Sequence, residues 1–416
     1  MKRRVVVTGM GCITPFGIGI DTLWNNLING KSAIRNLTVV DINKHLVHFG
    51  GEIPKFDPAP YVDAKDAKRM DKFILCTMVS AQEAMETSGL DLSKEDLTRF
   101  GVIAGSSAGG LDTIQKNHEV MQIRGCYKCS PFMVPMMITN MAAGKIAIKY
   151  GLRGLSKAVV TACATGAHSV GDAFRAIQYN DADLMIAGGS EAGICDIGLG
   201  AFSAARTLSK NNEHPTKASR PFDIKRDGFV MSEGSGLFVL EEREHALKRG
   251  AKIYAELVGY GQSTDAYDMV APDPKGSGAI LAIENALKDA GLEPKDVDYI
   301  NAHGTSTHVG DIAESNAIAK VFGDKLQNKN LLVSSTKSMT GHMLGGTGSI
   351  ECIISIKAML EGIIPPRINL DERDPEVADL DYVPNVARKK KINVVMSNSF
   401  GFGGHNAVLI FKRHEQ

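Results

Sequence analysis

A sequence repeat constrains the fold of this chain more than any other feature. The segment Ala84-Met-Glu-Thr-Ser-Gly89-Leu90 precedes a short apolar run, and Ala286-Leu-Lys-Asp-Ala-Gly291-Leu292 precedes a similar run in the second half of the chain. The first apolar segment, Arg4-Val-Val-Val-Thr-Gly9, likewise resembles Tyr254-Ala-Glu-Leu-Val-Gly259. Strand-like runs alternate with amphipathic segments in both copies, which is typical of βαβ units and mostly parallel central sheets. The repeat predicts an α/β protein of two similar halves.

We place the division between the halves near Lys248-Arg-Gly-Ala-Lys252, after the last strand-like run of the first copy. The predicted units are therefore 1–250 and 251–416. Each is long enough to form a sheet with its own hydrophobic core.

A cysteine lies where a strand-like run gives way to a helix-like segment. In Val159-Val-Thr-Ala-Cys163-Ala-Thr-Gly166, β-branched residues precede the cysteine, and small residues follow it. The next apolar residues have helical spacing, so Cys163 is expected at a helix N-terminus, where backbone N–H groups and the helix dipole stabilise a thiolate. Most free cysteines are inert buried residues, but this setting predicts a nucleophile.

Two histidines occupy small-residue loops that also follow strand-like runs. His303 lies in Asn301-Ala-His-Gly-Thr-Ser-Thr307, and His342 ends Lys337-Ser-Met-Thr-Gly-His342. Loops at the ends of strands are where α/β proteins place their catalytic groups. A lone histidine is more often structural, but two histidines and a cysteine in matching positions predict a shared active site.

These motifs resemble the signatures of the β-ketoacyl-[acyl-carrier-protein] synthases, and are most similar to those of the type II enzymes of bacterial fatty-acid synthesis. The matching segments are TACATG at 161–166, NAHGTST at 301–307, KSMTGH at 337–342 and NSFGFGG at 398–404. The resemblance covers nearly the whole chain. It implies the thiolase fold, in which two duplicated halves form a five-layered αβαβα architecture.

The resemblance also implies the chemistry. The family's Cys-His-His set falls on Cys163, His303 and His342, and its lysine falls on Lys337. Cys163 is expected to take up an acyl chain, with the amides of Cys163 and Phe400 holding the oxyanion. Decarboxylation of a malonyl thioester then gives an enolate, which neutral His303 and His342 stabilise by hydrogen bonding. The site lies between the halves, and no metal or organic cofactor is expected.

The role of Lys337 stays open between an electrostatic one and a structural one. A buried ion pair with Glu314 is as good an interpretation as a direct effect on the histidines. The resemblance further suggests a structural cation near Asn301, Glu351 and Asn398.

Other residues are assigned to the substrate. The hydroxyls of Thr305 and Thr307 suit the amides of a pantetheine arm, although such hydroxyls also cap loops. By resemblance, Phe202 and Phe400 line or gate the acyl pocket. Ala108 stands where the family commonly has a bulky aliphatic residue, which predicts a broader or longer chain-length range unless Met133 compensates.

The methionine-rich segment 130–141 is expected to pack across a two-fold axis in a homodimer, because the family uses this region in that way. A carrier protein is acidic, so its docking surface is expected to be basic. Lys65, Lys68 and Arg69 lie close together in sequence, and Arg206 is a further candidate contact.

Composition excludes several classes. Lys+Arg and Asp+Glu both total 47, so charge gives no indication of nucleic-acid binding. No apolar stretch is long enough to cross a bilayer, and the N-terminal one is too short for a signal peptide. Seven cysteines without paired spacing favour a cytoplasmic location, and the lone Cys126-Tyr-Lys-Cys129 has no assigned role.

The alternative that shares every catalytic residue is a stand-alone polyketide ketosynthase of a type II system. A degradative thiolase would use a second cysteine, which Gly403-Gly-His405-Asn406 does not supply. A non-catalytic chain-length subunit would lack the nucleophile.

Overall fold

The computed structural model describes residues 2–326 and 331–415. Its principal sheet has 11 strands. Their bounds are β1 (Val5–Thr14), β2 (Gly17–Ile18), β5 (Phe100–Gly105), β6 (Ser156–Lys157), β7 (Leu184–Glu191), β8 (Gly234–Glu242), β9 (Ala255–Thr264), β10 (Tyr299–Asn301), β11 (Leu332–Ser334), β14 (Val394–Gly401) and β15 (His405–Lys412). Two further pairs of short strands are β3 (Arg35–Asn36) with β4 (Phe49–Gly50), and β12 (Ile363–Ile364) with β13 (Arg388–Lys389).

The strand order repeats in mirror image about the centre of this sheet. The order is β11-β10-β14-β15-β9-β1-β8-β7-β5-β6, so β1, β8, β7, β5 and β6 correspond to β9, β15, β14, β10 and β11. The corresponding pairs also run in the same relative directions, parallel around β5 and β10 and antiparallel elsewhere. The sequence repeat is therefore a structural repeat.

The expectation of mostly parallel sheets is wrong. Among the strands in the described part of the chain, only the pairs around β5 and β10 are parallel. A short turn at 402–404 joins β14 to β15, and such a turn can connect only antiparallel neighbours. The sheets of the two halves are also joined, because Val5–Val7 of β1 pair antiparallel with Ala255–Leu257 of β9.

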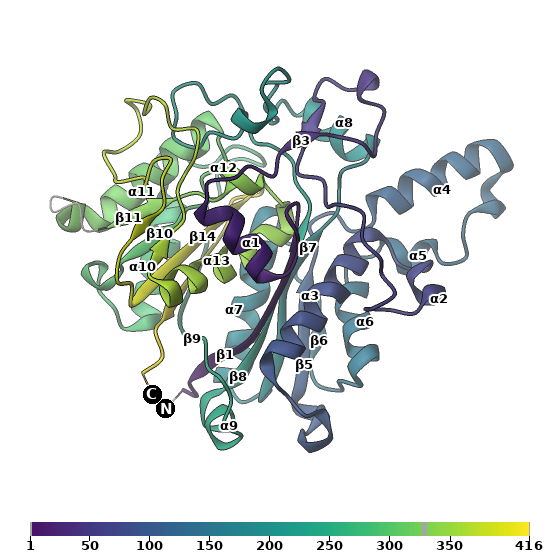
Figure 1. The fold of residues 1–416 in the computed structure, drawn as a ribbon, viewed down its shortest axis with the longest axis horizontal. Coiled ribbons are helices and arrows are strands. Elements are labelled where there is room, and N and C mark those ends of the chain that lie inside the picture. Colours follow the sequence, from purple (N-terminus) through teal and green to yellow (C-terminus); the bar gives the residue numbers. More distant parts are fainter. Residues whose placement is uncertain (1, 327–330, 416) are drawn as a thin grey trace.

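Helices cover both sheet layers and separate them. The helices are α1 (Ile20–Ile28), α2 (Ala64–Ala67), α3 (Lys72–Ser88), α4 (Leu111–Arg124), α5 (Met133–Met137), α6 (Met141–Tyr150), α7 (Thr165–Gln178), α8 (Asp196–Ala204), α9 (Arg243–Lys248), α10 (Ser277–Ala290), α11 (His308–Leu326), α12 (Lys337–Thr340) and α13 (Thr347–Glu361). Their arrangement around the strands can be followed in Figure 1.

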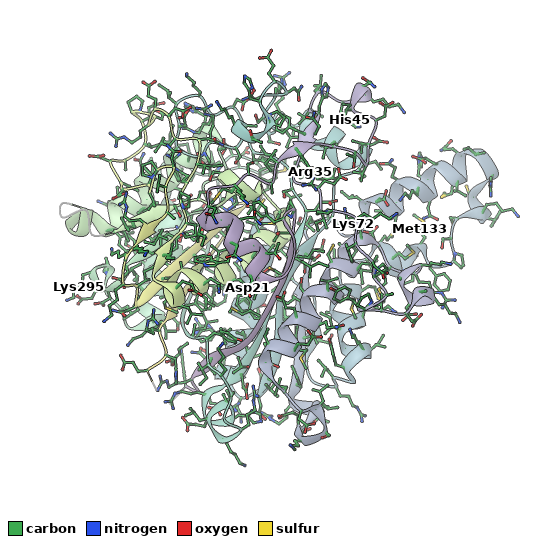
Figure 2. The ribbon with its side chains drawn as sticks, in the orientation of Figure 1. Asp21, Arg35, His45, Lys72, Met133 and Lys295 are labelled. Carbon is green, nitrogen blue, oxygen red and sulfur yellow. The ribbon has the colours of Figure 1, made fainter. Side chains whose placement is uncertain are left out.

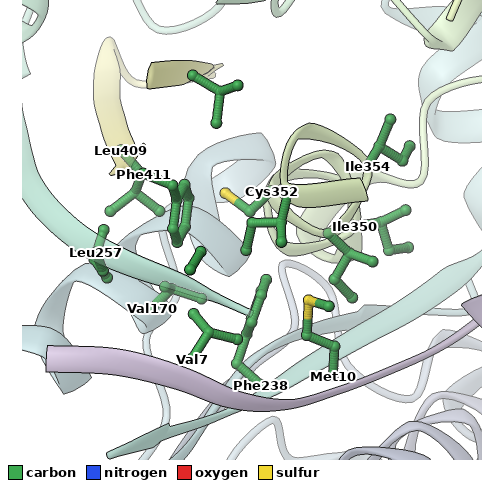
Figure 3. Close-up of a cluster of buried hydrophobic side chains, with 14 of the residues drawn as sticks. Val7, Met10, Val170, Phe238, Leu257, Ile350, Cys352, Ile354, Leu409 and Phe411 are labelled. Atoms are coloured by element: carbon green, nitrogen blue, oxygen red, sulfur yellow. The ribbon is translucent and has the colours of Figure 1, made fainter. Parts of the chain in front are cut away.

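The hydrophobic clusters define five layers. The central cluster joins α7 and α13 to strands of both halves; Figure 3 shows part of it, including Val7, Val170, Phe238, Leu257, Ile350 and Leu409. On the outer faces, α3 and α6 pack against β5 and β7, whereas α10 and α11 pack against β10, β14 and β15. This αβαβα arrangement confirms the predicted thiolase fold.

Glycines explain why the repeat is visible in the sequence. A Cβ atom on Gly9 would lie 2.1 Å from the Ala84 carbonyl oxygen, and one on Gly259 would lie 2.5 Å from that of Ala286. Glycine therefore lets β1 approach α3, and β9 approach α10, at matching places. The helices also end alike, at Gly89 with φ 63° and Gly291 with φ 64°.

The α4–α5 region projects from the body of the molecule in Figure 1, and Met133 lies on this side in Figure 2. Several large apolar side chains in or next to this region are exposed, among them Ile123, Tyr127 and Val134. Among the described residues, no helix has the length and apolar character needed to span a bilayer.

Candidate active site

A cavity of about 370 Å³ brings together the three residues predicted to react. Cys163 comes from the first half of the chain, and His303 and His342 come from the second. Five other residues predicted from the sequence line the same cavity: Phe202, Arg206, Thr305, Thr307 and Phe400. Residues from both parts of the sequence therefore line one cavity.

Cys163 sits in a one-turn 3₁₀ segment, Ala162–Ala164, directly before α7. The preceding residue, Ala162, has φ 49°, a left-handed conformation that is strained for a residue with a side chain. The predicted strand before the cysteine is shorter than expected, because β6 ends at Lys157. A tight turn, rather than the end of a strand, presents the sulfur to the cavity.

Burial dominates the acidity of Cys163. Its side chain is 8% exposed, and burial raises the pKa of the thiol to about 12. The positive charge of Lys337 and backbone hydrogen bonds from Phe402 and Cys163 act in the opposite direction. The backbone hydrogen bonds thus favour the thiolate, as expected for this position, but burial outweighs them and the pKa of the thiol lies above its usual value.

The two histidines face each other in the cavity wall. Their ring centroids are 5.4 Å apart, with the rings nearly perpendicular, and Phe400 packs 5.8 Å from His303. Burial lowers the pKa of both imidazoles well below the usual value, and the charge of Lys337 lowers both further. Both rings are therefore neutral at neutral pH.

One ring nitrogen of His342 is hydrogen-bonded, and the other has no partner in the described part of the chain. The bonded nitrogen is Nδ1, which lies 3.0 Å from Thr347 Oγ1, and the other is Nε2. When the Thr347 hydroxyl donates to Nδ1, the neutral ring carries its proton on Nε2. His342 can then offer an N–H group to a ligand.

Glu314 holds the His303 loop in place. Its carboxylate accepts hydrogen bonds from the backbone N–H groups of His303 (2.8 Å) and Gly304 (2.7 Å) and from Asn398 Nδ2 (3.1 Å). Glu314 lies in the second turn of α11, the helix that follows this loop. Its role in shaping the loop was missed from the sequence, where it was considered only as a partner of Lys337.

The ion-pair partner of Lys337 is Glu351, not Glu314. Lys337 Nζ lies 2.6 Å from Glu351 Oε1, and both side chains are 1% exposed. Burial raises the pKa of Glu351 to about 7, and the lysine opposes that change. The sequence cannot show this pair, because it depends on how α12 and α13 pack.

The remaining predicted residues lie elsewhere. Ala108 and Met133 do not line the cavity that contains Cys163. Lys65 and Lys68 are exposed, whereas the Arg69 guanidinium packs 4.2 Å from the centre of the Phe132 ring. Helix α2 ends at Ala67, so Lys65 lies within it, whereas Lys68 and Arg69 follow it.

Two aromatic residues that the sequence analysis did not assign also shape the cavity. Phe402 packs against Phe202 with ring centroids 6.5 Å apart, and Phe229 packs 5.3 Å from the His342 ring. Phe402 belongs to the glycine-rich motif at 398–404, so this motif could have identified it as a cavity residue. Phe229 carries no comparable signal.

Comparison with known proteins gives the class of the protein. The β-ketoacyl synthase N-terminal domain matches residues 2–246, and the β-ketoacyl synthase C-terminal domain matches residues 254–371. The chain belongs to the β-ketoacyl synthase family, which confirms the resemblance found in the sequence.

Relatives that match the whole chain bear a more specific name. The 3-oxoacyl-[acyl-carrier-protein] synthase 2 of Coxiella burnetii is 49% identical over 412 residues, which is 99% of each chain. That of Synechocystis sp. is 48% identical over 414 residues, covering 100% of this chain and 99% of the relative.

Solved structures share the fold over the full length of both chains. The ishigamide ketosynthase/chain length factor superimposes with a TM-score of 0.92 at 32% identity. A β-ketoacyl synthase from Burkholderia phymatum gives a TM-score of 0.91 at 35% identity. A type II polyketide acyl-carrier protein in complex with its ketosynthase gives a match with a TM-score of 0.91 at 34% identity.

Proposed function

We propose that this protein is a β-ketoacyl-[acyl-carrier-protein] synthase, an acyltransferase that lengthens fatty acyl chains by two carbons. The observation that carries the proposal is the single cavity that joins Cys163 to two neutral histidines. This set supplies a nucleophile and hydrogen-bond donors, and decarboxylative condensation needs both.

The first half-reaction transfers the acyl chain to Cys163. The sulfur attacks the thioester carbonyl, a tetrahedral oxyanion forms, and the pantetheine thiol leaves with the proton that Cys163 gives up. Because burial opposes a standing thiolate, the sulfur has to lose its proton as it attacks. The amides of Cys163 and Phe400 are the proposed oxyanion donors.

The second half-reaction uses the histidines. The malonyl thioester loses carbon dioxide, and the electron pair of the broken bond forms an enolate. Neutral His303 and His342 donate hydrogen bonds to its oxygen; each such donor is worth roughly 3 kcal/mol by comparison with known oxyanion holes. The enolate carbon attacks the carbonyl of acyl-Cys163, the bond between that carbonyl carbon and the sulfur breaks, and the sulfur leaves as a thiolate that takes a proton from water. Lys337 acts electrostatically, since its charge adds to the effect of burial in lowering the pKa of both rings.

The fatty-acid reaction is favoured over the polyketide alternative by the similarity of the whole chain. Relatives named 3-oxoacyl-[acyl-carrier-protein] synthase 2 are 48–49% identical, whereas the ketosynthase in complex with a type II polyketide acyl-carrier protein is 34% identical. Thr305 and Thr307 are the proposed contacts of the pantetheine arm. Their hydroxyl oxygens lie 3.0 Å apart in the cavity wall.

The proposed partners are an acyl carrier protein and a second copy of this chain, in the cytoplasm. Lys65, Lys68, Arg69 and Arg206 form the proposed docking set, and Arg206 lies where the cavity wall is exposed. Exposed apolar side chains on the projecting α4–α5 region support a homodimer. The proposal that Ala108 and Met133 line the acyl pocket depends on this homodimer.

Two structural proposals accompany this function. The halves are 1–250 and 251–416, with the site between them. A cation is proposed near Asn301, Glu351 and Asn398, because Oδ1 of each asparagine and Oε2 of Glu351 are buried without a partner in the described part of the chain. Buried oxygens of this kind suit a hard cation, which would balance charge and leave the reaction steps unchanged.

A condensation assay tests the function. Acyl carrier protein loaded with a fatty acyl chain and malonyl carrier protein are mixed with the protein, and the carrier products are weighed by mass spectrometry. A 3-oxoacyl chain two carbons longer is expected. His303→Ala and His342→Ala should each retain acylation of Cys163 but lose condensation by about 100-fold. Condensation at the wild-type rate in both variants would contradict the proposed roles.

A further inference from the structure

The turn that carries Cys163 needs support from outside itself. Ala162 holds a left-handed φ of 49°, and a strained residue of this kind persists only when its surroundings fix it. The nearest polar side chain before the strained residue is Thr161, whose hydroxyl lies 2.8 Å from His168 Nδ1. His168 lies on the first turn of α7 and is only 6% exposed.

His168 also reaches the other half of the protein. The ring borders a small pocket together with Thr161 and with His405 of β15. On this side the backbone of Asn406, the next residue of β15, raises the pKa of the ring through hydrogen bonding, as a backbone carbonyl does when it accepts from an imidazole. Asn406 pairs with Phe400 across the β14–β15 hairpin. The ring of Tyr260 packs edge-on at 6.2 Å on a further side of the imidazole.

The neutral imidazole suits both bonds. Burial lowers the pKa of His168 to about 4; the carboxylate of Asp172 opposes this change, and His405 on β15 adds to it. A neutral ring has one donor and one acceptor nitrogen, and here the Thr161 hydroxyl donates to one while the other donates to Asn406. Both nitrogens are therefore used.

The two elements that His168 joins are already in close contact. A Cβ atom on Gly401, in this hairpin, would lie 2.8 Å from the Thr161 carbonyl oxygen and 3.1 Å from the Cys163 amide nitrogen. A small shift of one element would therefore change the position of Phe400 and Phe402 relative to the sulfur.

We infer that His168 is a positioning residue that holds the Cys163 turn in register with the hairpin carrying Phe400 and Phe402. It contacts neither the substrate nor the reacting atoms in this account. Its effect is to keep the backbone donors on both elements aimed at the same oxyanion. This inference rests on the proposed function, because it concerns acyl transfer to Cys163.

Two reactions of the Cys163 sulfur distinguish a positioning role of His168 from a general loss of structure in the variant. Acyl transfer from an acyl carrier protein requires aligned oxyanion donors, whereas alkylation by iodoacetamide does not. His168→Ala should slow acylation of Cys163 at least tenfold, because small misplacements of catalytic groups have large effects on rate. Alkylation of Cys163 should stay within about threefold of wild type.

Thr161→Val removes one of the two bonds with almost no change of shape, so it should slow acylation in the same way but less. Combining it with His168→Ala should add no further loss, because Thr161 acts through His168. The matched control is Ser169→Ala on the same helix, since Ser169 Oγ has no hydrogen-bond partner among the described residues. This control should acylate at the wild-type rate.

The inference is overturned if Thr161→Val acylates at the wild-type rate, if the two losses multiply in the double variant, or if alkylation falls as much as acylation. These results differ from failure of the proposed function, in which wild-type Cys163 would take up no acyl chain at all.

Discussion

At the scale of single residues, the sequence predicted which side chains meet in the cavity and that both imidazoles are neutral, but not the high pKa of the thiol. Cys163, His303 and His342 could be predicted because each stands in a small-residue motif of known type. The thiol pKa of about 12 could not, because it is a balance between burial and the charge of Lys337 that depends on the folded structure. The Lys337–Glu351 pair was missed for the same reason.

The raised pKa of Cys163 predicts a distinctive pH dependence. The thiolate fraction grows as pH rises toward the pKa, so alkylation of Cys163 by iodoacetamide should rise about tenfold per pH unit from 7 to 9 without levelling off. Lys337→Met removes a charge that lowers this pKa, so it should slow alkylation at each pH. Peptide mass mapping distinguishes Cys163 from the more exposed Cys126 and Cys129. A plateau below pH 8.5, or faster alkylation in Lys337→Met, would contradict this account.

Ala108 carries a prediction about chain length. A methyl group leaves more room than a branched aliphatic side chain, so Ala108→Ile should narrow the range of accepted acyl chains toward shorter ones. The measurement is the rate of Cys163 acylation for carrier-bound chains of graded length. Ala108→Gly serves as the matched control and should keep the broad range. An unchanged length profile in Ala108→Ile would show that this position does not shape the pocket.

At the scale of elements, the sequence predicted the repeat and the alternation of strands and helices, but not how the strands are joined. The β1–β9 pairing and the antiparallel β14–β15 hairpin depend on contacts between distant segments. The repeated glycines were visible in the sequence, whereas the reason for them needed the structure. Each removes a side chain where a strand meets a helix backbone.

The close approach of β9 to α10 predicts the effect of a single methyl group. A Cβ atom on Gly261 would lie 2.0 Å from the Ala282 carbonyl oxygen, so Gly261→Ala should lower the free energy of unfolding by about 2–3 kcal/mol. In Gly200→Ala, on α8, the new methyl group meets nothing within 4 Å, and stability should be unchanged or slightly higher. Denaturant unfolding measures both. Equal stability of Gly261→Ala and wild type would show that β9 and α10 are not packed this closely.

At the scale of the whole molecule, the thiolase fold could be predicted because the family motifs extend over most of the chain. The sequence did not predict that the α4–α5 region projects from the body of the molecule, because a helical pattern does not reveal what the helix packs against. Ile123 is 83% exposed and Tyr127 is fully exposed. Exposed apolar side chains of this kind are the basis of the proposed contact with a second copy of the chain.

This surface predicts the oligomeric state. The wild type should be a dimer by sedimentation equilibrium, and the double variant Ile123→Glu with Tyr127→Glu should shift it toward monomer, because charge in an apolar interface is costly. Tyr179→Glu is the matched control, since Tyr179 is also exposed (63%) but lies at the end of α7. A monomeric wild type, or a double variant as dimeric as the wild type, would contradict the homodimer.

The most direct test of the central claim is the intact mass of the protein after mixing with carrier-bound fatty acyl chains of graded length. The account predicts one covalent acyl group per wild-type chain, located on Cys163, and none on Cys163→Ala. An acyl group that persists in Cys163→Ala, or a wild type that takes up no chain of any length, would contradict the assignment of Cys163 as the residue that carries the growing chain.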